Sequence, residues 1–307
     1  MNVLLTGSTG MVGMNIINNP SFKKFNILSP SRSELDLLEP KSLKTFFKKN
    51  QIDFVIHAAG LVGGIQANIE SPYSYLVDNS QIGMNLINVC LDSNIKNFLN
   101  MGSSCMYPKN FLKPLHESDL LQGPLEPTNE GYALAKIMVA KLCEYITNNS
   151  DYFEYKTVIP CNLYGAYDNF SYETSHMIPA VIRKIHDAKI HHSKTVEIWG
   201  DGNARREFMS ARDLSNFIYY ALENFINMPQ NINVGLGFDY SINEYYEIIG
   251  KKLGFEGEFI HNLDKPIGMK RKLLNIESLE LFGWKHGIGL EDGIEESYKF
   301  FLEHYAN

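Results

Sequence analysis

Short apolar runs alternate with longer segments of helical periodicity through the first half of the chain. Most positions within these runs are apolar, without a regular alternation with polar residues, which predicts strands that are covered on both faces. Regular alternation of strand and helix is typical of a parallel, doubly wound α/β sheet with right-handed crossovers. The predicted strands are Val3–Thr6, Phe25–Ser29, Phe54–His57, Phe98–Gly102 and Lys156–Pro160. The predicted helices are Met11–Asn18, Pro40–Lys49, Pro72–Ser93 and Glu130–Asn148.

The pattern changes after about residue 165 and becomes mostly helical, with two short strands at Val196–Trp199 and Asn231–Val234. We therefore expect a first domain over residues 1–165 and a smaller, mostly helical domain over residues 166–307. The second domain would pack at the carboxyl ends of the strands, and some of its segments would be free to return to the first. Its predicted helices are Ile178–Lys189, Leu214–Asn224, Ile242–Leu253 and Glu291–His304.

A glycine-rich turn, GSTGMVG, connects the first predicted strand to the first predicted helix. Such a turn places free main-chain N–H groups and a helix dipole against a diphosphate, and glycine lets the backbone approach closely. Directly after the first strand of a parallel sheet, it predicts a Rossmann-type dinucleotide-binding domain, with an ordinary strand–helix turn as the alternative. The residues expected to contact the cofactor here are Gly7, Ser8, Thr9, Gly10, Met11, Val12 and Gly13.

The end of the second strand indicates which dinucleotide binds. NAD enzymes usually have an acidic residue there for the ribose hydroxyls, whereas this chain has Arg32. A guanidinium binds a 2′-phosphate through charge-assisted hydrogen bonds, so the sequence favours NADP over NAD. The alternative role for Arg32 is that of a solvated surface arginine.

Composition narrows the class of protein. The chain has 307 residues, of which 44% are hydrophobic and 21% charged, as is typical of a soluble globular protein. Its net charge of −7 argues against a binder of nucleic acid or of an anionic membrane. The apolar runs are too short for a membrane span, and the first residues lack the features of a signal peptide. The cysteines do not occur at the paired spacings of a disulfide framework, which predicts reduced thiols and a cytoplasmic protein. Neither the cysteines nor the histidines have the spacing of metal ligands, so no metal site is expected.

Three residues predict proton transfer at a substrate oxygen. Tyr132 and Lys136 are four residues apart and therefore share one face of a helix. A phenol transfers protons poorly near neutral pH, and a neighbouring ammonium is expected to lower its pKa. Ser103, at the end of a predicted strand, is placed to hydrogen-bond the same substrate oxygen.

These residues lie within motifs that extend over nearly the whole chain. The motifs resemble those of the extended short-chain dehydrogenase/reductase superfamily and, more narrowly, of the GDP-L-fucose synthase family, which are GDP-4-keto-6-deoxy-D-mannose 3,5-epimerase/4-reductases. They are TGSTGMVG near the start, AAGLVGGI at 58–65, GSSCMYP at 102–108, LLQGPLEPTNEGYALAK at 120–136, NLYGAYDNF at 162–170, SHMIPA at 175–180, RREF at 205–208 and RKLLN at 271–275.

The resemblance implies an NADPH-dependent enzyme whose substrate is a GDP-linked 4-keto-6-deoxy sugar. It implies that Cys105 removes protons at C3 and C5 as a base and that His176 returns them as an acid. Thiol and imidazole suit this work because they titrate closest to neutral pH. Ser103 and Tyr132 would hold the developing oxyanion at O4, after which Tyr132 supplies the proton to O4 when C4 is reduced. Lys136 would tune Tyr132 and orient the nicotinamide ribose.

The resemblance also implies further contacts. For the cofactor, beside the glycine-rich turn and Arg32, they are Asp36, Leu37, Met101, Gly102, Ser103, Tyr132, Lys136, Pro160, Asn162, Leu163 and His176. For the nucleotide-sugar they are Ser104, Cys105, Asn162, Lys184, Trp199, Arg206 and Lys272. The long segments Pro72–Ser93 and Glu130–Asn148 correspond to a helix pair that forms a dimer interface in this superfamily, so a homodimer is expected.

Some positions depart from the family pattern. Thr9 stands where relatives often carry an arginine, Ile267 where they carry an aspartate, and Asn275 where they carry a second aspartate. The last two departures keep a related GDP-4-keto sugar open, either a heptose or a dideoxy sugar on the way to colitose, as well as a plain C4 reductase. A 4,6-dehydratase is disfavoured because Ser104-Cys105 replaces the acid expected after its active serine. A UDP-sugar 4-epimerase has no need of Cys105 and His176. The non-enzyme alternative is an NADP-binding sensor.

Overall fold

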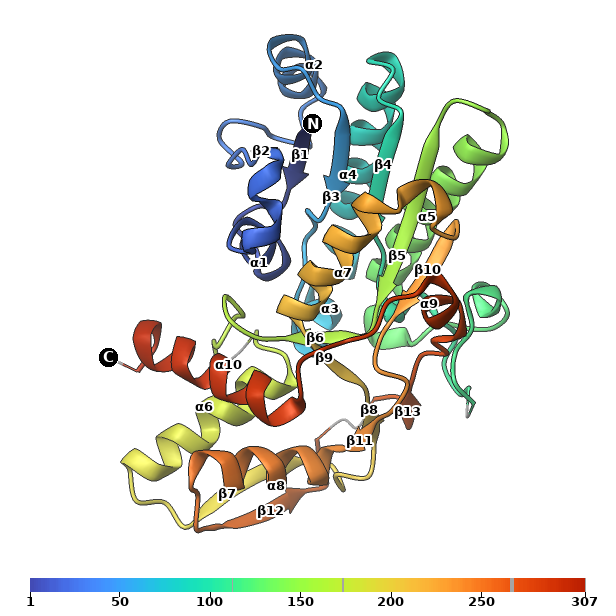
Figure 1. Cartoon of the computed structure of the whole chain (residues 1–307). Helices are drawn as coiled ribbons and strands as arrows, with labels where there is room; N and C mark the ends of the chain where they lie inside the picture. The colour runs from blue at the N-terminus through green and yellow to red at the C-terminus, as the bar shows by residue number, and fades with distance from the viewer. Residues whose placement is uncertain (112, 173, 266–267, 307) are drawn as a thin grey trace.

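The computed structural model describes residues 1–111, 113–172, 174–265 and 268–306 (Figure 1). Its centre is a six-stranded sheet with the order β10-β5-β4-β3-β1-β2, in which every neighbouring pair is parallel. The parallel α/β sheet predicted from the apolar runs is therefore confirmed. The strands of this sheet are β1 (Asn2–Thr6), β2 (Asn26–Leu28), β3 (Phe54–His57), β4 (Asn97–Met101), β5 (Glu154–Pro160) and β10 (Asn231–Val234).

Helices cover both faces of the sheet because its strands are apolar on both faces. In β1, Val3 and Leu5 pack into the core on one face, and Leu4 packs into the core on the other. Helices α1 and α7 cover the first face and pack against each other, whereas α2, α4 and α5 cover the second (Figure 1). These helices are α1 (Met11–Ile17), α2 (Pro40–Lys49), α4 (Pro72–Asp92), α5 (Glu130–Asn148) and α7 (Ala211–Glu223).

Two segments from the second half of the chain belong to this sheet layer: β10 is its edge strand, and α7 packs on one of its faces. A buried lysine anchors the turn between them: the ammonium of Lys156 in β5 donates to the main-chain carbonyls of Phe225 at 2.8 Å, Ile226 at 3.0 Å and Met228 at 2.9 Å. Three carbonyls of the turn that follows α7 thereby gain a charged donor. The edge strand β10 is thus held against β5.

The rest of the second half surrounds a separate core formed by α6, α8 and α10 with the parallel pair β7–β12 (Figure 1). Two small sheets, β6–β9 and β11–β8–β13, lie between this core and the main sheet. The helices are α6 (Met177–Ile190), α8 (Ile242–Leu253) and α10 (Leu290–His304). The strands are β6 (Asn162–Tyr164), β7 (Thr195–Trp199), β8 (Arg205–Arg206), β9 (Phe208–Ser210), β11 (Tyr240–Ser241), β12 (Glu258–Asn262) and β13 (Arg271–Lys272).

Short helices complete the connections: α3 (Ile65–Glu70), α9 (Glu277–Phe282), η1 (Pro20–Lys24), η2 (Ser104–Met106), η3 (Glu117–Asp119), η4 (Pro127–Asn129) and η5 (Phe225–Asn227). Within the described ranges, no helix is both long enough and apolar enough to cross a membrane.

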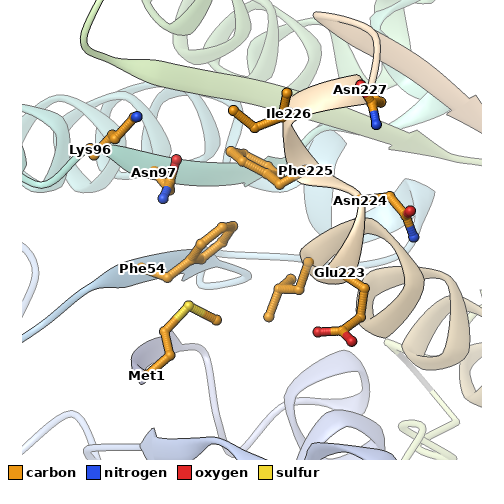
Figure 2. Close-up of a pocket in the computed structure, with 10 residues that line it drawn as sticks. Met1, Phe54, Lys96, Asn97, Glu223, Asn224, Phe225, Ile226 and Asn227 are labelled. Carbon is orange, nitrogen blue, oxygen red and sulfur yellow. The ribbon is translucent and has the colours of Figure 1, made fainter.

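The order of the strands fixes where a ligand binds. The chain leaves β1 in one direction to form β2 and then returns to form β3 on the other side, so the crossovers part above β1 and β3. Ligands of doubly wound sheets bind at such a point, outside the carboxyl ends of the strands. A cavity of about 260 Å³ lies at the opposite, amino edge, lined by Met1, Phe54, Lys96 and Asn97 together with the end of α7 (Figure 2).

Candidate active site

The glycine-rich turn lies at this crossover point and its backbone depends on glycine. Gly7 adopts a φ of 72°, and a Cβ on it would lie 2.6 Å from the main-chain nitrogen of Ala59. A Cβ on Gly13 would lie 2.2 Å from the carbonyl oxygen of Gly7. Gly10 caps α1 without a side-chain hydrogen bond, and both Thr9 and Gly10 are exposed. The first turn of α1 therefore presents main-chain N–H groups to the crevice, an arrangement that fits a diphosphate.

The end of β2 is tied to this turn. The Ser8 hydroxyl donates to the main-chain carbonyls of Ser29 at 3.3 Å and Pro30 at 3.1 Å. Arg32 follows with a side chain that is 78% exposed, and its Nε lies 4.0 Å from a carboxylate oxygen of Asp36. An exposed guanidinium at this position suits a 2′-phosphate.

Leu37 is placed differently from the other residues expected to contact the cofactor. Its side chain is buried in the core, and its main-chain carbonyl accepts a hydrogen bond from Asn85 Nδ2 at 2.9 Å. Any contact with a cofactor would therefore have to come from the remaining main-chain atoms of this residue.

Tyr132 and Lys136, one turn apart on α5, lie beside Ser103 at the end of β4. The Lys136 ammonium is 5.8 Å from the centre of the Tyr132 ring and donates to the main-chain carbonyl of Met101 at 2.9 Å. Burial lowers the pKa of Lys136 to about 8. Burial and the neighbouring Cys105 raise the pKa of Tyr132, and the hydrogen bond with Ser103 only partly offsets them. The expectation that this pKa is lowered is therefore wrong for the protein without ligand, because burial dominates, and the phenol is protonated at neutral pH.

Cys105 lies in η2, two residues after Ser103, and its main-chain N–H donates to the Ser103 hydroxyl at 3.2 Å. Two further donors contact its sulfur. Asn129 Nδ2 lies at 3.2 Å and the Lys272 ammonium at 3.4 Å. A cation and an N–H donor both stabilise a thiolate relative to a thiol. The surroundings of this sulfur therefore differ from those of Cys90, Cys143 and Cys161, which are buried.

His176 caps the amino end of α6, and its main-chain carbonyl accepts from the N–H of Ala180 at 3.0 Å. Its side chain is partly buried. Burial lowers the pKa of His176, and the nearby ammonium of Lys272 lowers it further. Lys272 therefore contacts the Cys105 sulfur and is near enough to His176 for its charge to act on the imidazole, although it is far from both in the sequence.

Asn129 is a residue of this site that sequence reasoning missed. It closes η4 directly before α5, three residues ahead of Tyr132. Its Nδ2 contacts the Cys105 sulfur, whereas its Oδ1 is buried without a hydrogen-bond partner. A buried acceptor without a donor is costly, so this oxygen suits a substrate hydroxyl. The available signal was its place in the motif LEPTNEGYALAK.

The residues expected to bind the nucleotide lie on the other side of the crevice. Trp199, at the end of β7, is 47% exposed, and the Lys184 ammonium lies 5.4 Å from its ring centre. Lys265 lies 5.1 Å from the same ring. Arg206 in β8 is opposite Lys272 in β13, whose ammonium contacts the Cys105 sulfur, so the two side chains share one face of this strand pair. This set of cations and an exposed aromatic ring suits a nucleoside diphosphate.

The remaining expected contacts lie at the ends of β4 and β5. The N–H of Gly102 donates to the carbonyl of Val158 at 2.7 Å, which fixes the segment before Ser103. Asn162 Nδ2 donates to the main-chain carbonyl of Glu207 at 3.1 Å, within the β6–β9 pair. Ser104 and Pro160 are buried, and Leu163 is partly buried against the core.

Two departures from the family pattern have different outcomes. Ile267 lies outside the described residues. The Asn275 side chain accepts from the main-chain N–H of Glu277 at 2.9 Å, at the start of α9, so it serves the beginning of a helix. Among the residues that the structure describes, no cluster of three or more histidine, cysteine, aspartate or glutamate side chains is arranged to hold a metal ion.

Comparison with known proteins agrees with this geometry. The model of a family described as the NAD dependent epimerase/dehydratase family matches residues 3–235. The chain is 54% identical over 307 residues to the GDP-L-colitose synthase of Yersinia pseudotuberculosis, with 100% of both chains covered. It is 44% identical over 300 residues to the GDP-L-fucose synthase of Azorhizobium caulinodans, with 98% of this chain and 96% of the relative covered.

A solved structure shares the whole architecture. It is a GDP-mannoheptose C4 reductase from Campylobacter jejuni with NADP bound, which is 32% identical to this chain. The two structures agree with a TM-score of 0.88, and 98% of each chain is covered.

Proposed function

The chain belongs to the NAD dependent epimerase/dehydratase family. We propose that it is an NADPH-dependent epimerase/reductase of a GDP-linked 4-keto sugar. One observation carries the proposal: the Lys272 ammonium contacts the Cys105 sulfur and its charge acts on His176, while the Cys105 N–H donates to the Ser103 hydroxyl that hydrogen-bonds Tyr132. Two groups suited to moving protons at carbon therefore share a crevice with a group suited to protonating an oxygen. A simple reductase needs only the second.

Epimerisation begins with removal of a proton next to the C4 ketone. The ketone acidifies this proton, and Cys105 takes it as a base whose thiolate is stabilised by the Lys272 ammonium and the Asn129 amide. Ser103 and Tyr132 donate to the enolate oxygen that forms at O4. His176 returns a proton from the opposite face, which inverts the carbon. Burial and Lys272 lower the pKa of His176, so its imidazolium gives up a proton readily, but only a minor fraction of the imidazole carries that proton at neutral pH.

Reduction follows at C4. NADPH, when bound, supplies a hydride to this carbon. Tyr132 delivers the proton to O4, and its raised pKa keeps that proton in place until the alkoxide forms. Lys136, held by the carbonyl of Met101, provides a positive charge beside the phenolate that is left. The glycine-rich turn and Arg32 would hold the diphosphate and the 2′-phosphate of the cofactor.

We propose two candidate sugars for the substrate. The motifs support a 4-keto-6-deoxy sugar that is epimerised at C3 and C5. A dideoxy sugar on the way to colitose is the second candidate, because the chain is more similar to the colitose synthase, at 54% identity, than to the fucose synthase, at 44%. The two candidates differ at C3, where a dideoxy sugar has no hydroxyl to invert.

The decisive experiment incubates the protein with NADPH and GDP-4-keto-6-deoxy-D-mannose in D2O and follows cofactor oxidation and deuterium in the product. Deuterium at both C3 and C5 supports the fucose-synthase-like activity. Deuterium at C5 alone indicates a single epimerisation, and none indicates a C4 reductase. No oxidation rejects this substrate and directs the test to dideoxy sugars and heptoses, and failure on all of these leaves the NADP-binding sensor.

A pair of cysteine variants controls this experiment. Cys105→Ser should suppress the deuterium exchange. Cys90→Ser removes a thiol that is buried in the core on α4 and should leave the exchange unchanged. Equal exchange in both variants contradicts the assigned base.

We further propose that residues 166–307, apart from α7 and β10, bind the nucleotide-sugar, and that the enzyme works in the cytoplasm as a homodimer. Of the apolar residues on the predicted interface helices, Leu86, Val89 and Ile137 are buried within the chain, and Ile82 packs partly against the core. A dimer surface must therefore use exposed side chains such as Val77 on α4 and Leu134 on α5. Analytical ultracentrifugation of Leu134→Glu tests this.

A further inference from the structure

Strands β8 and β13 form a parallel pair that places four cations on two faces. Arg205 is opposite Arg271, and Arg206 is opposite Lys272. Because successive side chains of a strand point to opposite faces, the first pair faces away from the second. Lys272 contacts the Cys105 sulfur, and Arg206 is its register partner across the ladder and so lies on the same face. The pair Arg206 and Lys272 therefore faces the active site, and the pair Arg205 and Arg271 faces away from it.

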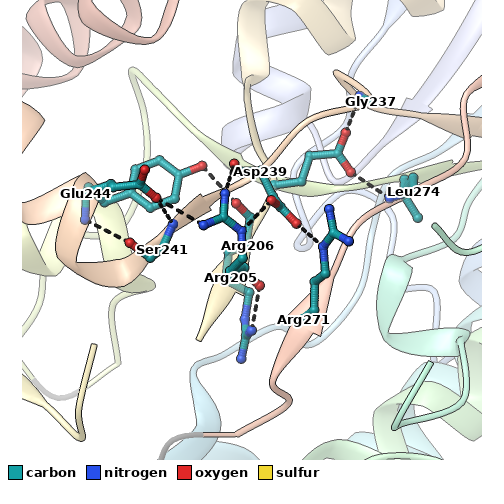
Figure 3. Close-up of polar contacts among 10 residues, drawn as sticks. Arg205, Arg206, Gly237, Asp239, Ser241, Glu244, Arg271 and Leu274 are labelled. Carbon is teal, nitrogen blue, oxygen red and sulfur yellow. Dashed lines mark hydrogen bonds and ion pairs between the residues drawn. The ribbon is translucent and has the colours of Figure 1, made fainter. Parts of the chain in front are cut away.

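A single buried carboxylate joins the two arginines on the far face (Figure 3). Asp239 has a side chain that is 3% exposed, and it accepts from Arg205 Nε at 2.7 Å and from Arg271 Nε at 2.6 Å. Burial by itself would raise the pKa of Asp239, but the hydrogen bonds from Arg271 and Arg205 outweigh it and lower the pKa. Asp239 is therefore an anion that clamps one strand to the other.

The loop that carries Asp239 is fixed to both strands by a second buried acid. Glu207 directly follows Arg206, and its carboxylate accepts from the main-chain N–H groups of Leu236 and of Gly237, the latter at 2.8 Å. Its other oxygen accepts from the N–H of Leu274 at 2.9 Å, two residues after Lys272. Glu207 thus fixes the loop before Asp239 relative to both strands.

The strands need this support because β8 and β13 are each two residues long. A ladder this short makes few main-chain hydrogen bonds of its own, and its further main-chain supports are β11 on the other edge of β8 and the bridge between Leu115 and Leu274 just after β13. A shift of about 1 Å at a reacting group is enough to cost a large part of the rate. The contact between Lys272 and Cys105 therefore depends on what holds the ladder.

Building on the proposed function, we propose that Asp239 is a positioning residue: by clamping Arg205 to Arg271 it fixes the β8–β13 pair and holds the Lys272 ammonium against the Cys105 sulfur. Asp239 does not touch the reacting groups itself. Its effect on proton transfer passes through Lys272.

The test is Asp239→Asn, which keeps the shape of the side chain and removes its charge. The first measurement is the rate at which iodoacetamide alkylates Cys105 at a fixed neutral pH without nucleotide-sugar, with the modified residue identified by mass spectrometry. The rate should fall about fivefold, because the sulfur loses its contact with the Lys272 ammonium. The second measurement is deuterium exchange at C3 and C5, which should fall about tenfold.

The alkylation measurement separates positioning from general loosening. In a Lys272→Met background, Asp239→Asn should change alkylation by less than about twofold, because the residue it acts through is already gone. Glu244→Gln removes another partner of Arg205, at 3.3 Å, without touching β13, and should leave both rates unchanged. If Asp239→Asn does not fold, Arg271→Lys keeps the charge but loses the guanidinium geometry, and the same rates should fall.

The proposal is overturned if a folded variant that still binds NADPH is alkylated at the wild-type rate. It is also overturned if the loss is as large in the Lys272→Met background. Because alkylation needs no substrate, it decides the role of Asp239 even if the wild-type protein does not turn over this sugar, a result that would count against the proposed function alone.

Discussion

The ammonium of Lys136 donates a hydrogen bond of 2.9 Å to the main-chain carbonyl of Met101, at the last residue of β4. The side chain is thus held between the sheet and the ring of Tyr132, with its centre of charge 5.8 Å from the middle of that ring. The same burial that fixes the ammonium also makes its charge costly. The burial that positions the Lys136 ammonium therefore also lowers its pKa.

The rate of reduction should depend on the charge of Lys136. Burial lowers the pKa of Lys136 to about 8, so the ammonium is present below this pH and is lost as the pH rises through it. We expect kcat for NADPH oxidation to be level from pH 6.5 to 7.5 and to fall by up to about tenfold per pH unit on the alkaline side. A profile that stays level to pH 9.5 would contradict this role.

Removal of the Tyr132 hydroxyl should affect reduction more than epimerisation. Tyr132→Phe keeps the ring and loses the proton for O4, so NADPH oxidation should fall by about 100-fold or more. Deuterium exchange should fall less, because Ser103 still donates to the enolate oxygen. The matched control is Tyr75→Phe, whose ring packs edge-on against Tyr132 at 6.4 Å. A loss of equal size in both variants would point to packing instead of proton transfer.

The amide of Asn129 should act on Cys105 without acting on the cofactor. Asn129→Ala removes the N–H that lies 3.2 Å from the sulfur, and we expect deuterium exchange to fall about tenfold with the Kd for NADPH unchanged. The neighbouring Thr128→Ala provides the control, since the Thr128 hydroxyl contacts Glu126 at 3.4 Å. Exchange at the wild-type rate in Asn129→Ala would remove this residue from the site.

The glycine-rich turn offers a stability test that needs no substrate. A Cβ on Gly13 would lie 2.2 Å from the Gly7 carbonyl oxygen, whereas a Cβ on Gly10 would lie 3.5 Å from the same atom. Gly13→Ala should therefore lower the free energy of unfolding by about 2 kcal/mol, with a lower Tm, and Gly10→Ala should leave it nearly unchanged. Equal Tm values for the two variants would show that the turn relaxes around the new methyl group.

Sequence patterns predicted the main sheet and its helices because each element buries its own side chains in a regular order. The segment Phe54–His57 begins with three apolar residues and is the strand β3. The helix α2 begins at Pro40 and ends at Lys49, as its periodicity predicted. The pairing of β10 with β5 could not be predicted from the sequence pattern, because pairing between strands far apart in sequence leaves no local signal.

The sequence by itself determined the parallel sheet, the glycine-rich turn and the shared helix face of Tyr132 and Lys136, since these depend on spacing within one element or between adjacent ones. Only the tertiary structure placed Lys272 and Asn129 at the Cys105 sulfur and both arginines on Asp239. Lys272 and Cys105 are 167 residues apart, and the bridge between Leu115 and Leu274 brings their two segments together. Such contacts arise from how separate elements pack, and the periodicity of no single element encodes them.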